Sequence, residues 1–355
     1  MMKQYGVLVV DDSSFMRRCI SLIIEKDPQF FIIGIARNGL DAIEKIQRLK
    51  PDIVTLDVEM PEMDGISALK EIMKTCPVPV VMLSNHTEDG TRTALKALEL
   101  GAIDIFLKGS LVGENIKEET INDFLSKLKA IADSSKVQKN KEDSNADLEN
   151  IKYDKQQINC GEKLMKRELL IIGCSTGGPS ALQSILPRFP KDLCRPVIVI
   201  QHMPPGFTGP LAERFDTICN LHVKEVENGD ILERGKIYIA PAGFQTLLEK
   251  SENNSIVFKV EDMKNVDSLY KPSINVTLNS AAPIFKDKLV SVILTGMGND
   301  GLAGCQNVKD NNGYVIVEAE ESCIVYGMPK VVFEAGLADS QVALSDMFET
   351  IMLNL

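Results

Sequence analysis

The sequence predicts two α/β domains, each built on a parallel sheet and joined by a polar linker. Short apolar segments rich in β-branched residues alternate with helix-period segments in both halves of the chain. Several of these segments are almost continuously apolar, as in 7–10 and 53–56, which is typical of strands that helices cover on both faces. A length of 355 residues also exceeds that of one ordinary domain.

We place the first domain at residues 1–133, the linker at 134–165 and the second domain at 166–355. The linker is polar and charged, with few large apolar residues, and a helix over 118–133 is expected to close the first domain. Strands are expected at 5–10, 30–36, 52–57, 78–83 and 103–107 in the first domain, and at 168–173, 196–201, 236–240, 289–295 and 313–318 in the second.

Composition narrows the class of protein. A formal net charge of -11 argues against a nucleic-acid-binding face, which needs clustered positive charge. The eight cysteines form no CxxC pair, so reduced thiols in a cytosol are the simplest interpretation. The amino terminus does not resemble a signal peptide and no apolar run is long enough to span a bilayer. We therefore expect a cytoplasmic protein without direct membrane insertion.

Polar residues follow four predicted strands of the first domain, where the carboxyl ends of parallel strands share one edge. They are Asp11 and Asp12, Asp57, Ser84 and Lys108. Carboxylates packed this closely repel each other unless a cation neutralises them, and oxygen ligands suit Mg²⁺. Each acid alone has about even odds of being a solvated strand end, but the whole group favours phosphoryl chemistry on a carboxylate.

These residues resemble the receiver domain of bacterial response regulators, through Val-Val-Asp-Asp-Ser-Ser at 9–14 and Val-Glu-Met-Pro-Glu-Met-Asp-Gly after Asp57. The resemblance implies a flavodoxin-like (βα)5 fold, a histidine kinase as phosphodonor and Asp57 as phospho-acceptor. Two positions depart from the receiver pattern. Gly109 follows Lys108 where proline is usual, and Ile105 stands where many receivers carry an aromatic switch residue, so the route from phosphate to output is left open.

Three glycine-bearing turns follow strands of the second domain and are expected at one sheet edge. The first exposes Ser175, a candidate nucleophile, although such turns also bind phosphate at helix N-termini. The second holds His202 beside two prolines, where it can act as the base. The third ends in Asp300, which can orient the imidazole, while the amides of Thr176 and of 296–298 are candidate oxyanion donors.

The second domain resembles the catalytic domain of the chemotaxis receptor methylesterase, a protein-glutamate methylesterase fused to a receiver. Its fold is expected to be a doubly wound parallel α/β methylesterase domain. The resemblance rests on Gly-Cys-Ser-Thr-Gly-Gly-Pro (173–179), Gln-His-Met-Pro-Pro-Gly-Phe-Thr (201–208), Ala-Pro-Ala-Gly (240–243), Thr-Gly-Met-Gly-Asn-Asp-Gly (295–301) and Val-Tyr-Gly-Met-Pro (325–329). It implies a triad of Ser175, His202 and Asp300, with supporting roles for Thr176 and Met297.

The same resemblance implies a methylated glutamate of a chemoreceptor as substrate, methanol as product, and deamidation of receptor glutamine as a second activity. The order Ser, His, Asp differs from that of the α/β-hydrolases. Two departures are visible. Cys174 precedes the serine where a small non-thiol residue is frequent, and 268–271 read Ser-Leu-Tyr-Lys where relatives carry arginine.

The alternative function is a response regulator whose second domain binds a nucleotide or a partner without catalysis. Residues 173–180 contain no Walker A lysine to support nucleotide binding, and a DNA-binding output would lack basic charge. A switch domain tethered to a catalytic one also suggests a mode of control. In this hypothesis the unphosphorylated receiver packs over the esterase cleft, and phosphorylation of Asp57 loosens the contact.

Overall fold

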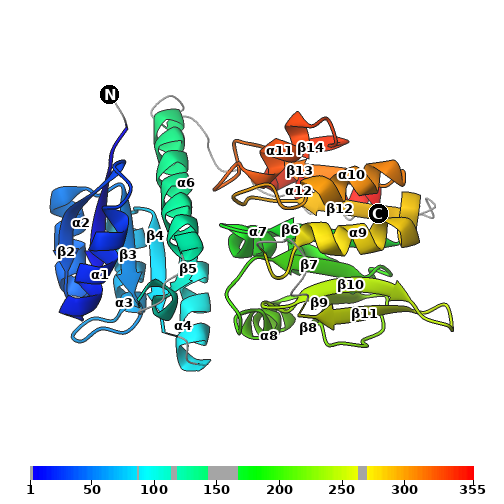
Figure 1. Cartoon of the computed structure of the whole chain (residues 1–355), viewed down its shortest axis with the longest axis horizontal. Helices are drawn as coiled ribbons and strands as arrows, with labels where there is room; N and C mark the ends of the chain where they lie inside the picture. Colours follow the sequence, from blue (N-terminus) through cyan, green and yellow to red (C-terminus); the bar gives the residue numbers. More distant parts are fainter. Residues whose placement is uncertain (1–2, 86–87, 113–117, 143–166, 263–269) are drawn as a thin grey trace.

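The computed structural model describes residues 3–85, 88–112, 118–142, 167–262 and 270–355, and it contains two α/β domains side by side (Figure 1). Both domains are built on parallel sheets, so the predicted fold class is confirmed. Helix α6 runs along the face of the first domain that is turned to the second (Figure 1).

The first domain has a five-stranded parallel sheet in the order β2-β1-β3-β4-β5. All five expected strands form. Side-chain caps start some of its helices, as where Ser13 accepts a hydrogen bond from the amide of Met16. The elements are β1 (Tyr5–Val10), α1 (Ser14–Ile24), β2 (Phe30–Ala36), α2 (Gly39–Leu49), β3 (Ile53–Asp57), α3 (Gly65–Thr75), β4 (Val80–Ser84), α4 (Glu88–Glu99), β5 (Asp104–Leu107), α5 (Lys108–Leu111) and α6 (Glu118–Glu142).

The closing helix is longer than expected. Helix α6 continues to Glu142 rather than ending at Asp133, so it takes in the first nine positions of the expected linker. Its apolar residues up to Ala132 pack against the first domain, and residues beyond 133 extend the helix without a change in hydrogen-bonding pattern. The rest of the expected linker, 143–165, lies outside the described residues.

The second domain has a seven-stranded sheet in the order β14-β13-β12-β6-β7-β9-β8, with a separate antiparallel hairpin of β10 and β11. The five expected strands occupy the middle of this sheet. The edge strands and the hairpin were not predicted. The elements are β6 (Leu169–Cys174), α7 (Gly178–Ile185), η1 (Leu186–Arg188), β7 (Val197–Gln201), α8 (Thr208–Ile218), β8 (His222–Glu225), β9 (Lys236–Ile239), β10 (Gln245–Lys250), β11 (Ile256–Glu261), α9 (Ile274–Phe285), η2 (Lys286–Lys288), β12 (Leu289–Ile293), α10 (Leu302–Asp310), β13 (Tyr314–Glu318), α11 (Met328–Glu334), β14 (Ser340–Val342) and α12 (Leu344–Asn354).

The central strand β6 shows how this sheet is buried on both faces. Its residues alternate between two cores: Leu170 and Ile172 pack in a cluster with α7, α8 and α12, whereas Leu169 and Ile171 pack in one with α9, α10 and α11. Every residue of β6 is buried. The loop after β6 is therefore held by a rigid strand in the middle of the sheet.

The two domains contact each other directly. Arg92 of α4 pairs with Glu213 of α8 at 3.3 Å, and Arg214 of α8 pairs with Glu99 of α4. Val325 of the second domain belongs to the same buried cluster as first-domain residues, Phe106 of β5 among them. The face of the first domain that carries α4, β5 and α6 is thus packed against the second domain (Figure 1).

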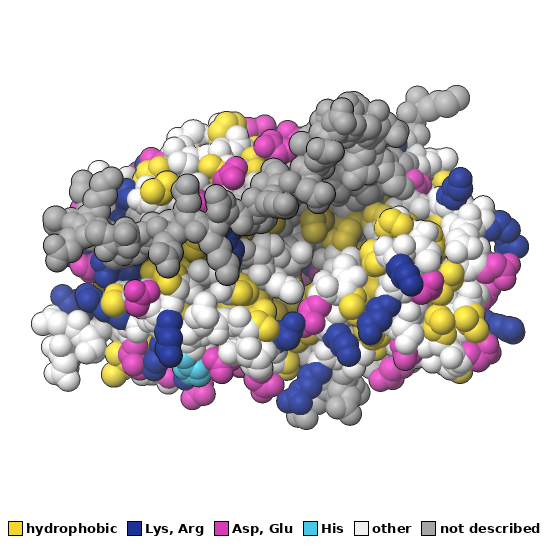
Figure 2. All heavy atoms as spheres, turned by 180° about the vertical axis from the view of Figure 1, so that it is seen from behind, with side chains coloured by type: hydrophobic (Ala, Val, Ile, Leu, Met, Phe, Trp, Pro, Cys, Tyr) yellow, Lys and Arg dark blue, Asp and Glu magenta, His cyan; other side chains and the backbone are white. Residues whose placement is uncertain are grey.

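One described face of the molecule carries charges of both signs. Figure 2 shows acidic and basic side chains interspersed over the described part of one face. Among the described residues, none of the helices combines the length and the apolar character that crossing a membrane requires.

Candidate functional site

The loops after β6, β7 and β12 bring Ser175, His202 and Asp300 to one edge of the second sheet. This follows from the strand order, in which β6 lies between β12 and β7. His202 Nε2 lies 2.8 Å from Asp300 Oδ2, and the amide of His202 donates to the carbonyl of Cys174 beside Ser175. Ser175 and Asp300 are both buried. The three residues named from sequence therefore share one small site.

Asp300 is held by the N-terminus of α9. Its carboxylate accepts hydrogen bonds from Ser273 Oγ at 2.9 Å and from the amides of Ile274 and Asn275 at 2.7 and 3.0 Å. Burial raises the pKa of Asp300, but the bonds from His202 and these amides outweigh it and keep the pKa below the usual value. Asp300 is thus an ionised partner for an imidazolium. Sequence reasoning missed Ser273, whose signal was a helix-capping serine after proline.

His202 has one ring nitrogen left over. With Nε2 on Asp300, Nδ1 is buried and has no hydrogen-bond partner among the described residues. No hydrogen bond joins His202 to Ser175 in this part of the chain, as is common for catalytic pairs without substrate. The imidazole also stacks on Tyr270, with ring centroids 4.3 Å apart and planes 1° from parallel. Tyr270 was not identified from sequence.

Gln201 ties the nucleophile turn to the histidine turn. Its buried side-chain amide donates to the carbonyls of Ser175 and His202, both at 3.0 Å, and its oxygen accepts from Cys174 Sγ at 2.9 Å. Burial raises the pKa of the Cys174 thiol, which therefore stays a protonated donor. Cys174, one of the two departures from the family pattern, is thus a hydrogen-bond donor within the site. Gln201 was missed because its role depends on contacts across strands.

The loop over 295–298 lies beside Ser175. The amide of Ser175 donates to the carbonyl of Thr295 at 3.0 Å. The amide of Gly296, one of the expected oxyanion donors, donates to the carbonyl of Val325 at 3.0 Å. It is therefore not available to bind an oxyanion. Buried Glu318 accepts from the amide of Thr295 at 2.8 Å, and burial raises its pKa. The loop is therefore anchored from both neighbouring strands.

The first domain reaches the edge of this site. Thr176 Oγ1, next to Ser175, donates to Asp104 Oδ2 of β5 at 2.7 Å. Met297 packs against the apolar cluster of the first domain. The two residues expected to support the nucleophile are thus the ones that contact the receiver.

The first domain carries the acidic site expected from sequence. Oxygens of Asp11, Asp12 and Asp57 lie within 4.8 Å of one another. Lys108 Nζ lies 2.6 Å from Asp57 Oδ2 and 2.8 Å from Asp11 Oδ2. Burial raises the pKa of Asp57 to about 6, although Lys108 opposes this effect. The Ser84 hydroxyl instead lies within hydrogen-bonding distance of the carbonyls of Asn85 and of Gly90 in α4.

This arrangement fits a magnesium ion. Asp11 and Asp57 are buried carboxylates that face each other, one lysine ammonium contacts both of them, and the ligand set of the three acids is oxygen only. The acidic pocket is typical of the Mg²⁺-binding phosphorylation site of receiver domains.

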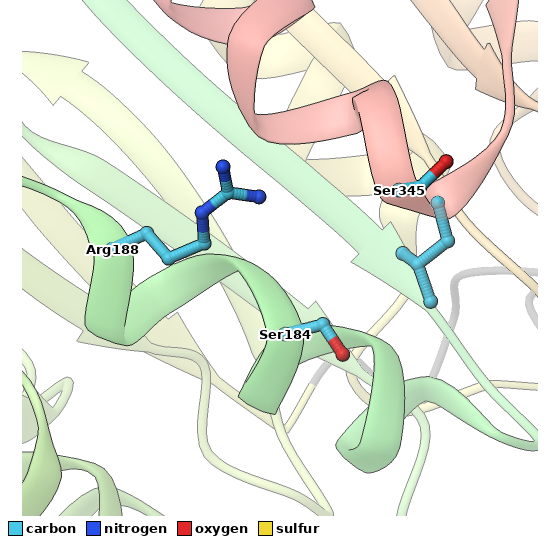
Figure 3. Close-up of a pocket in the computed structure, with 4 residues that line it drawn as sticks. Ser184, Arg188 and Ser345 are labelled. Carbon is cyan, nitrogen blue, oxygen red and sulfur yellow. The ribbon is translucent and has the colours of Figure 1, made fainter. Parts of the chain in front are cut away.

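A surface pocket elsewhere in the second domain takes no part in either site. It lies between the α7–η1 segment and α12 and is lined by Ser184, Arg188, Leu344 and Ser345 (Figure 3). Arg188 is the charged residue among these four, and it already forms an ion pair with Glu349.

Comparison with known proteins agrees with this division of the chain. Residues 170–351 match the family model described as CheB methylesterase, and residues 7–120 match that of the response regulator receiver domain. A protein-glutamate methylesterase/protein-glutamine glutaminase of Symbiobacterium thermophilum is 40% identical over 338 residues, 94% of this chain and 92% of the relative. One of Oceanobacillus iheyensis is 40% identical over 350 residues, 98% of this chain and 97% of the relative.

A solved structure supports the fold of the second domain. The crystal structure of the Thermotoga maritima CheB methylesterase catalytic domain superposes with a TM-score of 0.51 at 41% identity. It covers 53% of this chain and 99% of that one.

Proposed function

Because the chain belongs to the CheB methylesterase family, we propose that Ser175, His202 and Asp300 are its catalytic triad. The activity is that of a protein-glutamate methylesterase/protein-glutamine glutaminase, regulated by its receiver domain in chemotactic adaptation. The observation that carries the triad is the 2.8 Å contact of His202 with a buried carboxylate, which leaves Nδ1 as the ring nitrogen that can take a proton. A binding domain without catalysis has no need of this pair.

The reaction follows from these groups. Ser175 Oγ attacks the glutamyl ester carbonyl while His202 takes the hydroxyl proton, and Asp300 stabilises the imidazolium that forms. His202 then returns the proton to the departing methoxide, so methanol leaves and an acyl-enzyme remains. A water molecule, deprotonated by His202, attacks the acyl-enzyme and frees the carboxylate. With a glutamine substrate, ammonia leaves in place of methanol.

The tetrahedral intermediate needs hydrogen-bond donors for its oxyanion. We assign this role to the backbone amides around Thr176 and Met297. Both residues lie beside Ser175 on anchored loops, and the Gly296 amide is excluded by its bond to Val325. Both also contact the receiver, so displacement of the receiver would change the surroundings of the oxyanion site.

The receiver is proposed to take a phosphoryl group on Asp57 from a chemotaxis histidine kinase. Asp11, Asp12 and Asp57 would hold Mg²⁺, which neutralises the acids and the phosphoryl oxygens. Lys108 is placed to contact the new phosphoryl group, and Ser84 is the proposed switch hydroxyl after its present bonds break. Methyl-accepting chemoreceptors are the proposed substrates, and the cytoplasm is the proposed compartment.

The contacts between the domains support the proposed mode of control. Asp104 of the receiver binds Thr176 directly beside the nucleophile, and Val325 is buried among receiver residues. In this arrangement the unphosphorylated receiver restricts access to Ser175, and phosphorylation of Asp57 loosens the contact.

The test is methanol release from membranes that contain methylated receptors. Wild type and Ser175→Ala are compared, each with and without acetyl phosphate and Mg²⁺. Ser184→Ala is the matched control, because Ser184 is an exposed serine on α7, the helix that follows the nucleophile turn. Release that disappears only in Ser175→Ala and rises with acetyl phosphate supports the triad and the switch. Release that persists in Ser175→Ala refutes the triad.

A further inference from the structure

The catalytic imidazole of this site is held on two sides. Asp300 fixes its edge at Nε2, and the phenol ring of Tyr270 covers one of its faces, 4.3 Å away and parallel within 1°. An imidazole held only at one nitrogen can still rotate through small angles about its Cβ–Cγ bond without losing that hydrogen bond. A flat ring packed on its face opposes that rotation and keeps Nδ1 directed to one side.

Tyr270 is itself anchored to the frame that holds Asp300. The buried side chain of Gln245 donates through Nε2 to the carbonyl of Tyr270 at 2.7 Å and accepts at Oε1 from the amide of Ser273 at 2.9 Å. Ser273 Oγ in turn donates to Asp300. The edge support and the face support of His202 thus belong to one hydrogen-bonded unit at the start of α9.

The hydroxyl end of Tyr270 lies against the loop that follows β12. A Cβ atom built on Gly298 would lie 2.8 Å from Tyr270 Oη, so this glycine makes room for the phenol. Asp123 and Lys127 of α6 also act electrostatically on the hydroxyl. Burial raises the pKa of Tyr270, which keeps the phenol neutral.

We propose that Tyr270 is a positioning residue for His202, acting through the face of its ring. The proposal rests on the triad proposed above. The ring restricts the imidazole in the free enzyme, and its π face stabilises the positive charge that His202 acquires when it takes the Ser175 proton. The second effect exists only once the proton has moved. Loss of the ring should therefore lower kcat rather than raise KM.

The experiment uses the full-length chain with acetyl phosphate and Mg²⁺, so that the receiver does not mask the site. Tyr270→Phe keeps the ring and removes the hydroxyl, whereas Tyr270→Leu and Tyr270→Met remove the ring. Phe244→Leu is the matched aromatic control, because Phe244 is exposed and lies in the same domain. The readouts are kcat and KM for methanol release, the rate at which an organophosphate labels Ser175, and the melting temperature.

We expect Tyr270→Phe and Phe244→Leu to stay within about twofold of wild type. Tyr270→Leu and Tyr270→Met should lower kcat and the labelling rate roughly tenfold with KM unchanged, the scale of a desolvated cation–π contact. Unchanged kcat in both aliphatic variants overturns the proposal, as does an equal loss in Tyr270→Phe. A change confined to KM also overturns it, by placing Tyr270 in substrate binding. A different result would refute the proposed triad itself: methanol release that persists in Ser175→Ala.

Discussion

Replacing Asp104 by alanine should activate the enzyme without phosphorylation. Asp104 Oδ2 accepts a 2.7 Å hydrogen bond from Thr176 Oγ1, the hydroxyl next to the proposed nucleophile Ser175. Thr176 is almost wholly buried in this arrangement. The substitution removes a receiver side chain from the edge of the active site and leaves every residue of the second domain in place.

The magnitude follows from the kind of contact that is lost. A hydrogen bond to a charged group contributes about 1.5–3 kcal/mol, and the partial exposure of Asp104 favours the lower value. The exposed pair of Arg92 and Glu213 contributes about 0–1 kcal/mol. Loss of about 1.5 kcal/mol from the closed arrangement raises the open-to-closed ratio roughly tenfold. The basal rate should rise by about the same factor while the open form is scarce.

The assay is methanol release by full-length protein without a phosphodonor, with Arg92→Ala as the matched interface control. We expect a roughly tenfold higher basal rate for Asp104→Ala, at most about a fivefold higher one for Arg92→Ala, and little change in either phosphorylated rate. An unchanged basal rate in Asp104→Ala, with normal folding, would refute the reasoning that this contact restrains the site.

Two further predictions concern the two sites separately. Gly296→Ala should lower kcat about 100-fold, because its Cβ would lie 2.7 Å from Ser175 Cβ and 2.6 Å from Met328 Cε. Gly109→Ala, whose Cβ meets nothing within 4 Å, should leave methanol release unchanged. Asp57→Asn should raise the melting temperature at pH 8 in Mg²⁺-free buffer but not at pH 4. Burial raises the pKa of Asp57 from 3.8 to about 6 in the folded protein. As the pH rises through this range, the folded protein therefore loses stability relative to the unfolded chain, and an asparagine at this position, which does not ionise, avoids that loss. An equal gain in melting temperature at pH 4 and pH 8 would contradict this reasoning.

Much of the fold could be predicted from sequence, because central strands have the strongest pattern. Strands β6, β7 and β12 are buried at every position, and their continuous apolar runs are visible without a structure. The edge strands β8 and β14 have only four and three residues, most of them partly exposed, so their pattern is weak. The hairpin of β10 and β11 is only partly buried, and its short apolar runs are interrupted by charged residues, so its pattern is also weak.

The residues of the candidate site also fall into a group that could be predicted from sequence and a group that could not. Ser175, His202 and Asp300 follow predicted strands within glycine-bearing turns, so their types and positions were informative. Gln201 and Tyr270 were missed for a physical reason. Each acts through a contact between segments far apart in the sequence, 26 residues between Gln201 and Ser175, and no local pattern reports such a contact.

Strand β5 offers a physical answer to the question left by Ile105. Lys108, just beyond its end, contacts Asp57, and Asp104 at its beginning contacts Thr176. The four residue steps from Asp104 to Lys108 span about 13 Å of extended chain, a distance over which a rigid strand could transmit a displacement without an aromatic switch at 105. Phosphorylation would draw Lys108 to the new phosphoryl group and so act on the same strand that holds Thr176. This route depends on a contact between two domains, and therefore no pattern within the receiver sequence could indicate it.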